Sequence, residues 1–210
     1  MIGFSRDAAP KERLALTLDD GSVLEREFEV EKRTYEVDRV DGLHKNQVAL
    51  DAETKKKLAK AEAELDAIRM KFGKSDCYKE SFQWPIKGRI SSRYGQPRVL
   101  NGVDSGPHYG VDIVAAVGSP VRAPACGKVI KIGKDLPLSG NVLILDHGRG
   151  LTSTFIHLAG FKVKEGAEVK QGDVIATVGM TGRTNGAHLD WRMNLYDIRT
   201  DPELLAPPMQ

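Results

Sequence analysis

The chain has 210 residues, of which 40% are apolar and 29% are charged, a composition that is ordinary for a globular protein and sufficient for one sizeable core. Its 31 basic and 29 acidic side chains leave a formal net charge of +2, which gives no electrostatic case for nucleic-acid binding. No apolar run approaches the roughly 20 residues of a membrane-spanning helix.

The N-terminus and the cysteines give expectations about location and metal chemistry. The first seven residues lack a basic region followed by an apolar one, so they do not form a secretory signal, and we expect either a cytosolic protein or a chain that lacks its leader. Cys77 and Cys126 are too few for a disulfide framework, and we expect two unpaired, partly buried thiols. No C-x-x-C spacing is present, so a metal would be bound by His and carboxylate side chains.

Residues 1–50 are predicted to form a partial β segment followed by a linker. Alternating residues 13–18 and the strand-like run 23–30 flank the turn residues 19–22, which predicts a hairpin. Two strands are not stable alone, so this hairpin must pack elsewhere or belong to a β domain that the chain contains only in part. Residues 31–50 carry mixed charge and little periodicity, which is typical of a linker.

One amphipathic helix is predicted over residues 51–73. Asp51 is a suitable N-cap with Glu53 in the first turn, and Gly73 is suited to end the helix. Apolar residues recur at helical spacing on one face, and the opposite face is rich in Lys and Glu. The apolar set is Leu58, Ala61, Leu65, Ile68 and Phe72.

From about residue 82 to residue 200 the pattern is all-β. Short apolar runs alternate with glycine-containing turns, as in 127–133, 141–146 and 174–179. A small echo, Val-Lys-x-Gly, ends at Gly166 and again at Gly172, each a position suited to a turn with positive φ. The proline-containing C-terminus beyond residue 201 is predicted to be a loosely held fringe.

Two His/Asp pairs stand out in this β region. His108 and Asp112 are four residues apart, and the intervening Gly110 favours a turn that leads into a strand. His188 and Asp190 lie in a strand-like run, where alternate residues share a face. Their neighbours Leu189 and Trp191 are then predicted to point into the core, which leaves a polar face suited to a metal site.

Several ordered motifs between residues 82 and 200 resemble the lysostaphin/LytM-type zinc metallopeptidase family. They are Pro107-His108-Tyr109-Gly110-Val111-Asp112-Ile113, Gly118-Ser119-Pro120-Val121-Arg122-Ala123-Pro124, Asp146-His147-Gly148, Phe155-Ile156-His157-Leu158, Val169-Lys170-Gln171-Gly172-Asp173-Val174-Ile175, Val178-Gly179-Met180-Thr181-Gly182-Arg183 and Gly186-Ala187-His188-Leu189. The resemblance implies a mainly β protein whose C-terminal domain is a compact antiparallel β-sheet or β-barrel sandwich. It also implies zinc, hydrolysis of peptide bonds in bacterial peptidoglycan, and a periplasmic or extracellular location.

By the same resemblance, His108 and Asp112 fall on metal ligands, and His157 and His188 fall on the two histidines that handle water and the transition state. The family's third ligand is a histidine, and this chain has Asp190 there. A carboxylate oxygen is an accepted zinc ligand. It can replace the histidine with little backbone change if the family histidine binds through Nδ1, and it is too short if that histidine binds through Nε2. Two carboxylate ligands neutralise the ion, so we predict a weaker Lewis acid with activity displaced to higher pH.

Other interpretations stay open. Arg98 and Asn101 precede His108 and are candidates to line a substrate groove, although a plain surface loop is equally compatible. Asp190 is also compatible with a degenerate module that binds or activates other cell-wall hydrolases without catalysis. A biotinyl or lipoyl carrier shares some of the β texture, but no lysine of the β region is flanked by Met or Ala as a carrier's lysine is. His147 is interpreted as a turn-supporting residue.

Overall fold

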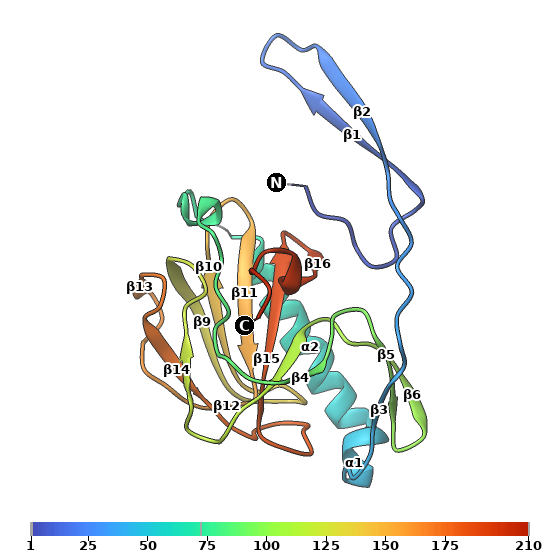
Figure 1. Ribbon diagram of the computed structural model, residues 1–210, viewed down its shortest axis with the longest axis vertical. Coiled ribbons are helices and arrows are strands. Elements are labelled where there is room, and N and C mark those ends of the chain that lie inside the picture. Colours follow the sequence, from blue (N-terminus) through green and yellow to red (C-terminus); the bar gives the residue numbers. More distant parts are fainter. Residues whose placement is uncertain (1, 72, 210) are drawn as a thin grey trace.

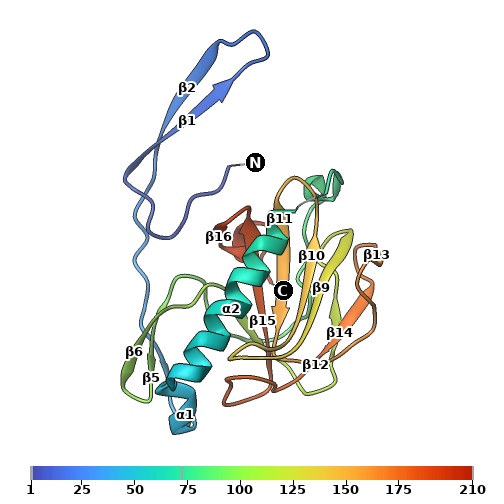
Figure 2. The ribbon, with the colours of Figure 1, turned by 180° about the vertical axis from the view of Figure 1, so that it is seen from behind.

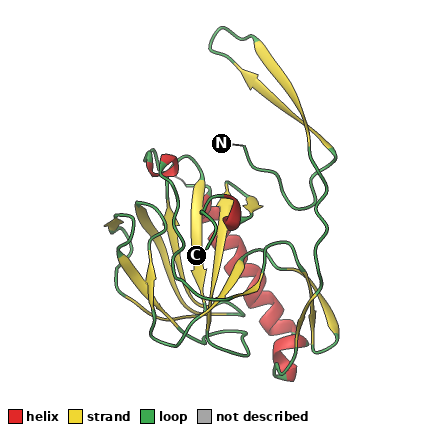
Figure 3. Ribbon diagram, in the orientation of Figure 1, coloured by secondary structure: helices red, strands yellow, loops and turns green. Residues whose placement is uncertain are grey.

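The computed structural model describes residues 2–71 and 73–209, with residue 46 described by its backbone only, and most of its regular structure is strand (Figure 3). The helices are α1 (Lys45–Val48) and α2 (Ala52–Arg69), with short 3-10 helices η1 (Cys77–Lys79) and η2 (Pro202–Leu204). The strands are β1 (Lys11–Thr17), β2 (Val23–Glu29), β3 (Asp38–Val40), β4 (Ile90–Ser92), β5 (Pro97–Leu100), β6 (Val103–Pro107), β7 (Val111–Val114), β8 (Pro120–Arg122), β9 (Gly127–Leu136), β10 (Gly140–Asp146), β11 (Leu151–Ile156), β12 (Leu158–Phe161), β13 (Glu168–Val169), β14 (Val174–Val178), β15 (His188–Leu195) and β16 (Ile198–Thr200).

The core lies between two antiparallel sheets. The larger sheet has the strand order β13-β9-β10-β11-β15-β7-β4, with β16 beside β15, and the smaller has the order β12-β14-β8. Buried side chains from both sheets, such as Phe155 and Trp191 from the larger and Ile175 and Val178 from the smaller, form one apolar cluster. The prediction of a mainly antiparallel β fold is confirmed, and the described strands form open sheets rather than a closed barrel.

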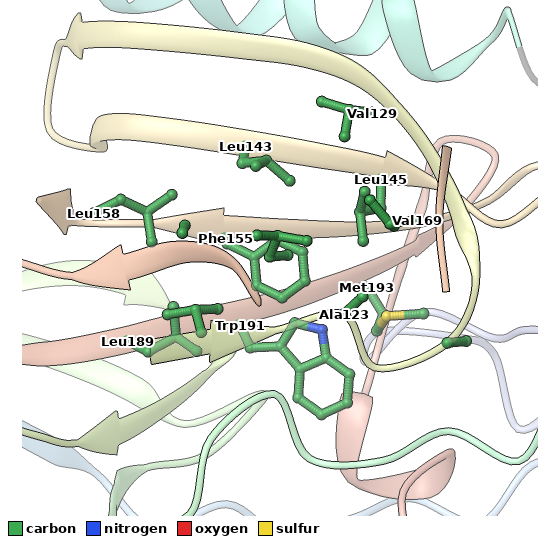
Figure 4. Close-up of a cluster of buried hydrophobic side chains, with 14 of the residues drawn as sticks. Ala123, Val129, Leu143, Leu145, Phe155, Leu158, Val169, Leu189, Trp191 and Met193 are labelled. Atoms are coloured by element: carbon green, nitrogen blue, oxygen red, sulfur yellow. The ribbon is translucent and has the colours of Figure 1, made fainter. Parts of the chain in front are cut away.

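Strand β15 separates the core from the polar face of the larger sheet. Leu189, Trp191 and Met193 are fully buried in the cluster (Figure 4). The alternate residues His188, Asp190 and Arg192 therefore point to the opposite face, as strand geometry requires.

Helix α2 packs across that opposite face of the larger sheet (Figure 2). Its Leu65 is buried against Val142, Ile144 and Ile156 of β10 and β11. Asp51 caps the helix by accepting a hydrogen bond from the Thr54 backbone N–H at 2.6 Å, as predicted.

The C-terminal end of α2 differs from the prediction. The helix ends at Arg69, not near residue 72, and the predicted apolar position Phe72 lies outside the described residues. Arg69 turns its guanidinium toward Asp66 and Thr154, so the last turn of the helix is held by polar contacts as well as apolar ones.

The predicted hairpin is confirmed as β1 and β2, which pair in antiparallel register and project away from the β body (Figure 1). Leu16, Val23 and Leu24 are each more than half exposed on it. No helix in the described part of the chain is long and apolar enough to cross a membrane.

The predicted linker contains regular structure. Strand β3 pairs in parallel with β5, and α1 follows it. The three-residue strand and four-residue helix are too short to produce a periodic signal, so the mixed charge of residues 31–50 concealed them.

Two further expectations are wrong. Cys77 and Cys126 form a disulfide that ties η1 to the loop before β9, with a Cα–Cα distance of 5.2 Å. Residues 49 apart are brought together only by the fold, so their spacing gave no sign of the pairing. The C-terminus beyond residue 201 is also held in place: Pro202 is buried, Leu205 and Ala206 pack against the core cluster, and the Pro207 carbonyl accepts from the Trp84 indole.

Candidate functional site

The pairing of β7 with β15 brings the predicted metal ligands together. His108 follows the end of β6, and Asp112 on β7 lies directly opposite Asp190 on β15. All three side chains are buried, and each offers a ligand atom within 4.8 Å of the other two. Two neighbouring residues, His108 and Asp112, and the distant Asp190 thus converge at one buried point on the polar face of the sheet.

Two atoms at this point are buried without a hydrogen bond in the described part of the chain. They are Nε2 of His108 and Oδ1 of Asp112, which lie 3.1 Å apart. A buried polar atom without a partner carries a desolvation cost of about 1–3 kcal/mol, so such atoms call for a ligand or a water. Burial alone raises the pKa of the Asp112 carboxyl, but the neighbouring His108 and Arg98 outweigh it and hold that pKa well below its usual value.

An arginine holds each carboxylate from another side. The Arg98 guanidinium donates to Oδ2 of Asp112 and, at 2.9 Å, to Oδ2 of Asp38 on β3. Arg192 donates through Nε and Nη2 to the Asp190 carboxylate at 2.6–3.1 Å. Burial raises the pKa of the Asp190 carboxyl, whereas Arg192 lowers it more strongly together with His108, so this buried carboxyl has a lowered pKa.

The predicted catalytic histidines lie beside this cluster with their ring centroids 4.9 Å apart. Nδ1 of His157 donates to the Thr181 carbonyl at 2.7 Å, and Nδ1 of His188 donates to the Gly186 carbonyl at 2.9 Å, because a carbonyl oxygen can only accept. Both rings therefore carry their proton on Nδ1 in the neutral form, which leaves Nε2 as an acceptor.

The environments of these two histidines differ. Burial lowers the pKa of His157 to about 4, so its ring is neutral at pH 7. His157 also has a positive φ of 62°. This backbone conformation is unfavourable in free energy for a residue other than glycine, and such conformations cluster at functional sites. Nε2 of His188 lies 3.7 Å from the same Asp112 Oδ1 that lacks a hydrogen bond.

A cavity of about 410 Å³ opens over these groups. Asp112, His157 and His188 line it, together with Arg98 and Arg183. The N-terminal segment contributes a wall of the cavity through Asp38, Arg39, Val40 and Leu43. The segment is fastened across the rim where Asn185 donates to the Asp41 carbonyl at 3.1 Å.

Comparison with known proteins identifies the fold. The family model described as peptidase family M23 matches residues 106–202. A crystal structure of a putative M23 peptidase from Pseudomonas aeruginosa shares 30% identity, covers 97% of this chain and 77% of that chain, and superposes with a TM-score of 0.77. This chain belongs to peptidase family M23.

Other M23 proteins match a smaller part of the chain. The peptidoglycan DD-endopeptidase ShyA of Vibrio cholerae is 34% identical over 123 residues, which cover 56% of this chain and 28% of ShyA. A zinc-containing peptidase from Vibrio cholerae, known as a crystal structure, shares 31% identity over 58% of this chain and 39% of that chain, with a TM-score of 0.54. The chain thus spans less than a third of the length of ShyA.

M23 proteins are zinc metallopeptidases, and the residues of this M23 domain fit a cation. The ligand set contains one imidazole and two carboxylates, which are accepted zinc ligands. The fit rests on the buried Nε2 of His108 and Oδ1 of Asp112, which face each other at 3.1 Å without a hydrogen bond in the described residues, so a cation bound by both would satisfy both atoms.

The structure gathers six of the seven predicted site residues and separates Asn101 from them. His108, Asp112, His157, His188 and Asp190 surround one point. Arg98 lines the cavity with its guanidinium occupied by two carboxylates. Asn101 is not among the residues described as lining the cavity, because its side-chain amide bonds both backbone groups of Leu43.

Sequence reasoning missed two residues of the M23 site. Arg192 is two positions after Asp190. The strand alternation that groups His188 with Asp190 puts Arg192 on the same face, so the sequence did contain a signal for this residue. Asp38 gave no signal, since its contact with Arg98 depends on the parallel pairing of β3 with β5.

Proposed function

We propose that this M23 domain is a zinc-dependent endopeptidase that hydrolyses peptide bonds in bacterial peptidoglycan. The observation that carries the proposal is the pair of buried ligand atoms on His108 and Asp112 that face each other without a hydrogen bond, with Asp190 and two anchored histidines beside them. The names of the relatives support the substrate and the metal, because ShyA is a peptidoglycan DD-endopeptidase and one similar structure is a zinc-containing peptidase.

The proposed roles follow from the geometry. Nε2 of His108, Oδ1 of Asp112 and the Asp190 carboxylate would hold zinc, which supplies a Lewis acid for the scissile carbonyl and lowers the pKa of bound water. His157 and His188 each keep Nδ1–H on a backbone carbonyl, so each has Nε2 available for proton transfer. Together they are suited to take a proton from water and to deliver one to the leaving amine.

A location outside the cytoplasm follows from the proposed substrate. The Cys77–Cys126 disulfide supports it, since disulfides persist in oxidising compartments such as the bacterial periplasm. We therefore keep the periplasmic or extracellular location as part of the proposal.

The proposal is tested by incubating the purified protein with isolated peptidoglycan and analysing the released fragments by liquid chromatography and mass spectrometry. We expect new amino and carboxyl ends at peptide bonds, loss of activity after chelation, and recovery on addition of zinc. The His188→Ala variant serves as a control, because it should bind zinc and fail to hydrolyse. A zinc-loaded wild-type protein that cleaves no bond would overturn the proposal.

A second candidate is a non-catalytic M23 module that binds or activates other cell-wall hydrolases. This candidate is favoured by the ion pairs of Arg98 with Asp112 and of Arg192 with Asp190, because the two guanidiniums balance the charges of both carboxylates without a metal. This candidate predicts peptidoglycan or hydrolase binding without zinc and without hydrolysis, so zinc content and fragment analysis together separate the two.

A further inference from the structure

Arg192 forms a forked contact with Asp190, in which one guanidinium reaches both carboxylate oxygens. Its Nε lies 3.0 Å from Oδ1 and 3.1 Å from Oδ2 of Asp190, and its Nη2 lies 2.6 Å from Oδ2. The planar guanidinium therefore spans both carboxylate oxygens and fixes the plane of the carboxylate as well as its position.

Gly110 lies against both Asp190 and Arg192. A Cβ atom added at Gly110 would lie 2.2 Å from Oδ1 of Asp190, closer than two such atoms can approach, and it would also be 2.7 Å from Cγ of Arg192. The backbone of Gly110 therefore packs closely on the Asp190–Arg192 pair and leaves no room for a side chain there, and the Asp190 side chain is 1% exposed.

Charge gives Arg192 a second consequence. Asp112 and Asp190 lie opposite each other on paired strands, so two buried negative charges face one site. With two carboxylates a divalent ion is formally neutral, whereas one carboxylate and two imidazoles leave +1. The Arg192 guanidinium returns the local sum to +1, which offsets the loss of Lewis acidity expected from a second carboxylate ligand.

Arg98 does not play the same part for Asp112. Its guanidinium is shared between Asp112 and Asp38 of the N-terminal segment, and it comes from a different strand than the residue it pairs with. Arg192 lies on the same strand as Asp190, and Asp190 is the one carboxylate to which the described structure shows it hydrogen-bonded.

We propose that Arg192 is a positioning residue that orients the Asp190 carboxylate for the metal and balances its charge, so that an aspartate can serve where a histidine otherwise would. The inference rests on the proposed zinc site. It predicts that Arg192 matters for zinc only while residue 190 is an aspartate, because an imidazole needs neither the guanidinium fork nor its charge.

A double-mutant cycle on zinc affinity tests this dependence. The four proteins are the wild type, Arg192→Met, Asp190→His and the variant with both changes, titrated with zinc against a chromophoric chelator of known affinity. Removing a group that orients a metal ligand typically costs about 10–100-fold in metal affinity. We expect a loss of that size for Arg192→Met in the wild-type background and less than about 3-fold in the Asp190→His background.

Two further variants separate orientation from charge. Arg192→Lys keeps the positive charge but not the planar fork, so its zinc affinity should lie between those of the wild type and Arg192→Met. Arg199→Met removes a nearby guanidinium for which the described structure shows no hydrogen bond to Asp190, and zinc affinity should then stay level or rise. Far-ultraviolet circular dichroism and melting temperature establish that each variant is folded. If Arg192→Met does not fold, Arg192→Lys carries the test in both backgrounds.

The outcomes are distinct. An equal loss in both backgrounds, no loss, or a gain in affinity for Arg192→Met would overturn the inference while leaving the zinc site in place. A wild-type protein that binds no zinc would overturn the proposed function and this inference with it.

Discussion

Two clusters of buried histidine and carboxylate lie on the same β fold and differ in how their polar atoms are satisfied. In the first, His147 bonds the Cys126 carbonyl and the Ser153 hydroxyl, both at 2.7 Å, and Asp146 accepts from two backbone N–H groups. In the second, Nε2 of His108 and Oδ1 of Asp112 have no hydrogen bond among the described residues.

The difference supports the proposal that the His108 cluster, and not the His147 cluster, binds a ligand. A buried network that is fully satisfied stabilises the fold and needs nothing else, whereas unpartnered atoms are costly unless something binds them. The His147 cluster also adjoins the Cys77–Cys126 disulfide, away from the cavity, while the His108 cluster lies beneath it. Burial and residue type alone do not separate the two.

The largest expected effect separates the clusters by function. His108→Gln should lower zinc affinity and peptidoglycan hydrolysis by more than about 100-fold, because it removes a ligand rather than a group behind one. His147→Gln is the matched control: it breaks two satisfied hydrogen bonds and should lower the free energy of unfolding by about 1–3 kcal/mol with zinc affinity unchanged. Zinc titration and urea unfolding measure both. Loss of zinc in the His147 variant would erase the distinction between the clusters.

The next effect concerns the disulfide beside the His147 cluster. Replacing both Cys77 and Cys126 with serine opens a covalent loop between residues 49 apart, which should lower the free energy of unfolding by roughly 4 kcal/mol. Zinc affinity measured at a temperature where the variant is folded should remain that of the wild type. A variant as stable as the wild type would show that this end of the fold does not depend on the bond.

A third effect is the pH dependence of stability. Burial lowers the pKa of His147 to about 4 from 6.5, so the unfolded chain binds a proton at this residue between those values and the folded chain does not. Stability from this residue is complete above pH 6.5 and decreases by about 3 kcal/mol as the pH falls to 4. The free energy of unfolding, measured with urea from pH 7 to 4, should fall less steeply with decreasing pH for His147→Gln than for the wild type. Identical slopes would contradict the satisfied, neutral state assigned to His147.

The smallest effect concerns Asn101. Its side chain makes two hydrogen bonds with the Leu43 backbone and is held away from the cavity. Asn101→Ala should therefore lower the free energy of unfolding by about 1 kcal/mol and leave the KM for peptidoglycan fragments unchanged. A raised KM with unchanged stability would return Asn101 to the substrate-binding role predicted from the sequence.

The sequence predicted most of the β fold and the candidate cluster because both depend on local patterns. Strand alternation placed His188 and Asp190 on one face and Trp191 on the other, and the resemblance to the lysostaphin/LytM-type family implied His108, Asp112 and His157. The disulfide, the pairing of β3 with β5 and the packed C-terminus depend on contacts between residues far apart in the chain, and no local pattern encodes them. The same strand alternation puts Arg192 on the face of His188 and Asp190, although the sequence prediction extended only to Trp191.

The most direct test of the account is the zinc content of the purified wild-type protein and of Asp190→Ala after dialysis, measured by mass spectrometry of the metal. The account predicts one zinc per wild-type chain and a substantially lower content in the variant, with both proteins folded. Equal zinc content in the two proteins would remove Asp190 from the ligand set, and a wild-type protein without zinc would contradict the proposed site.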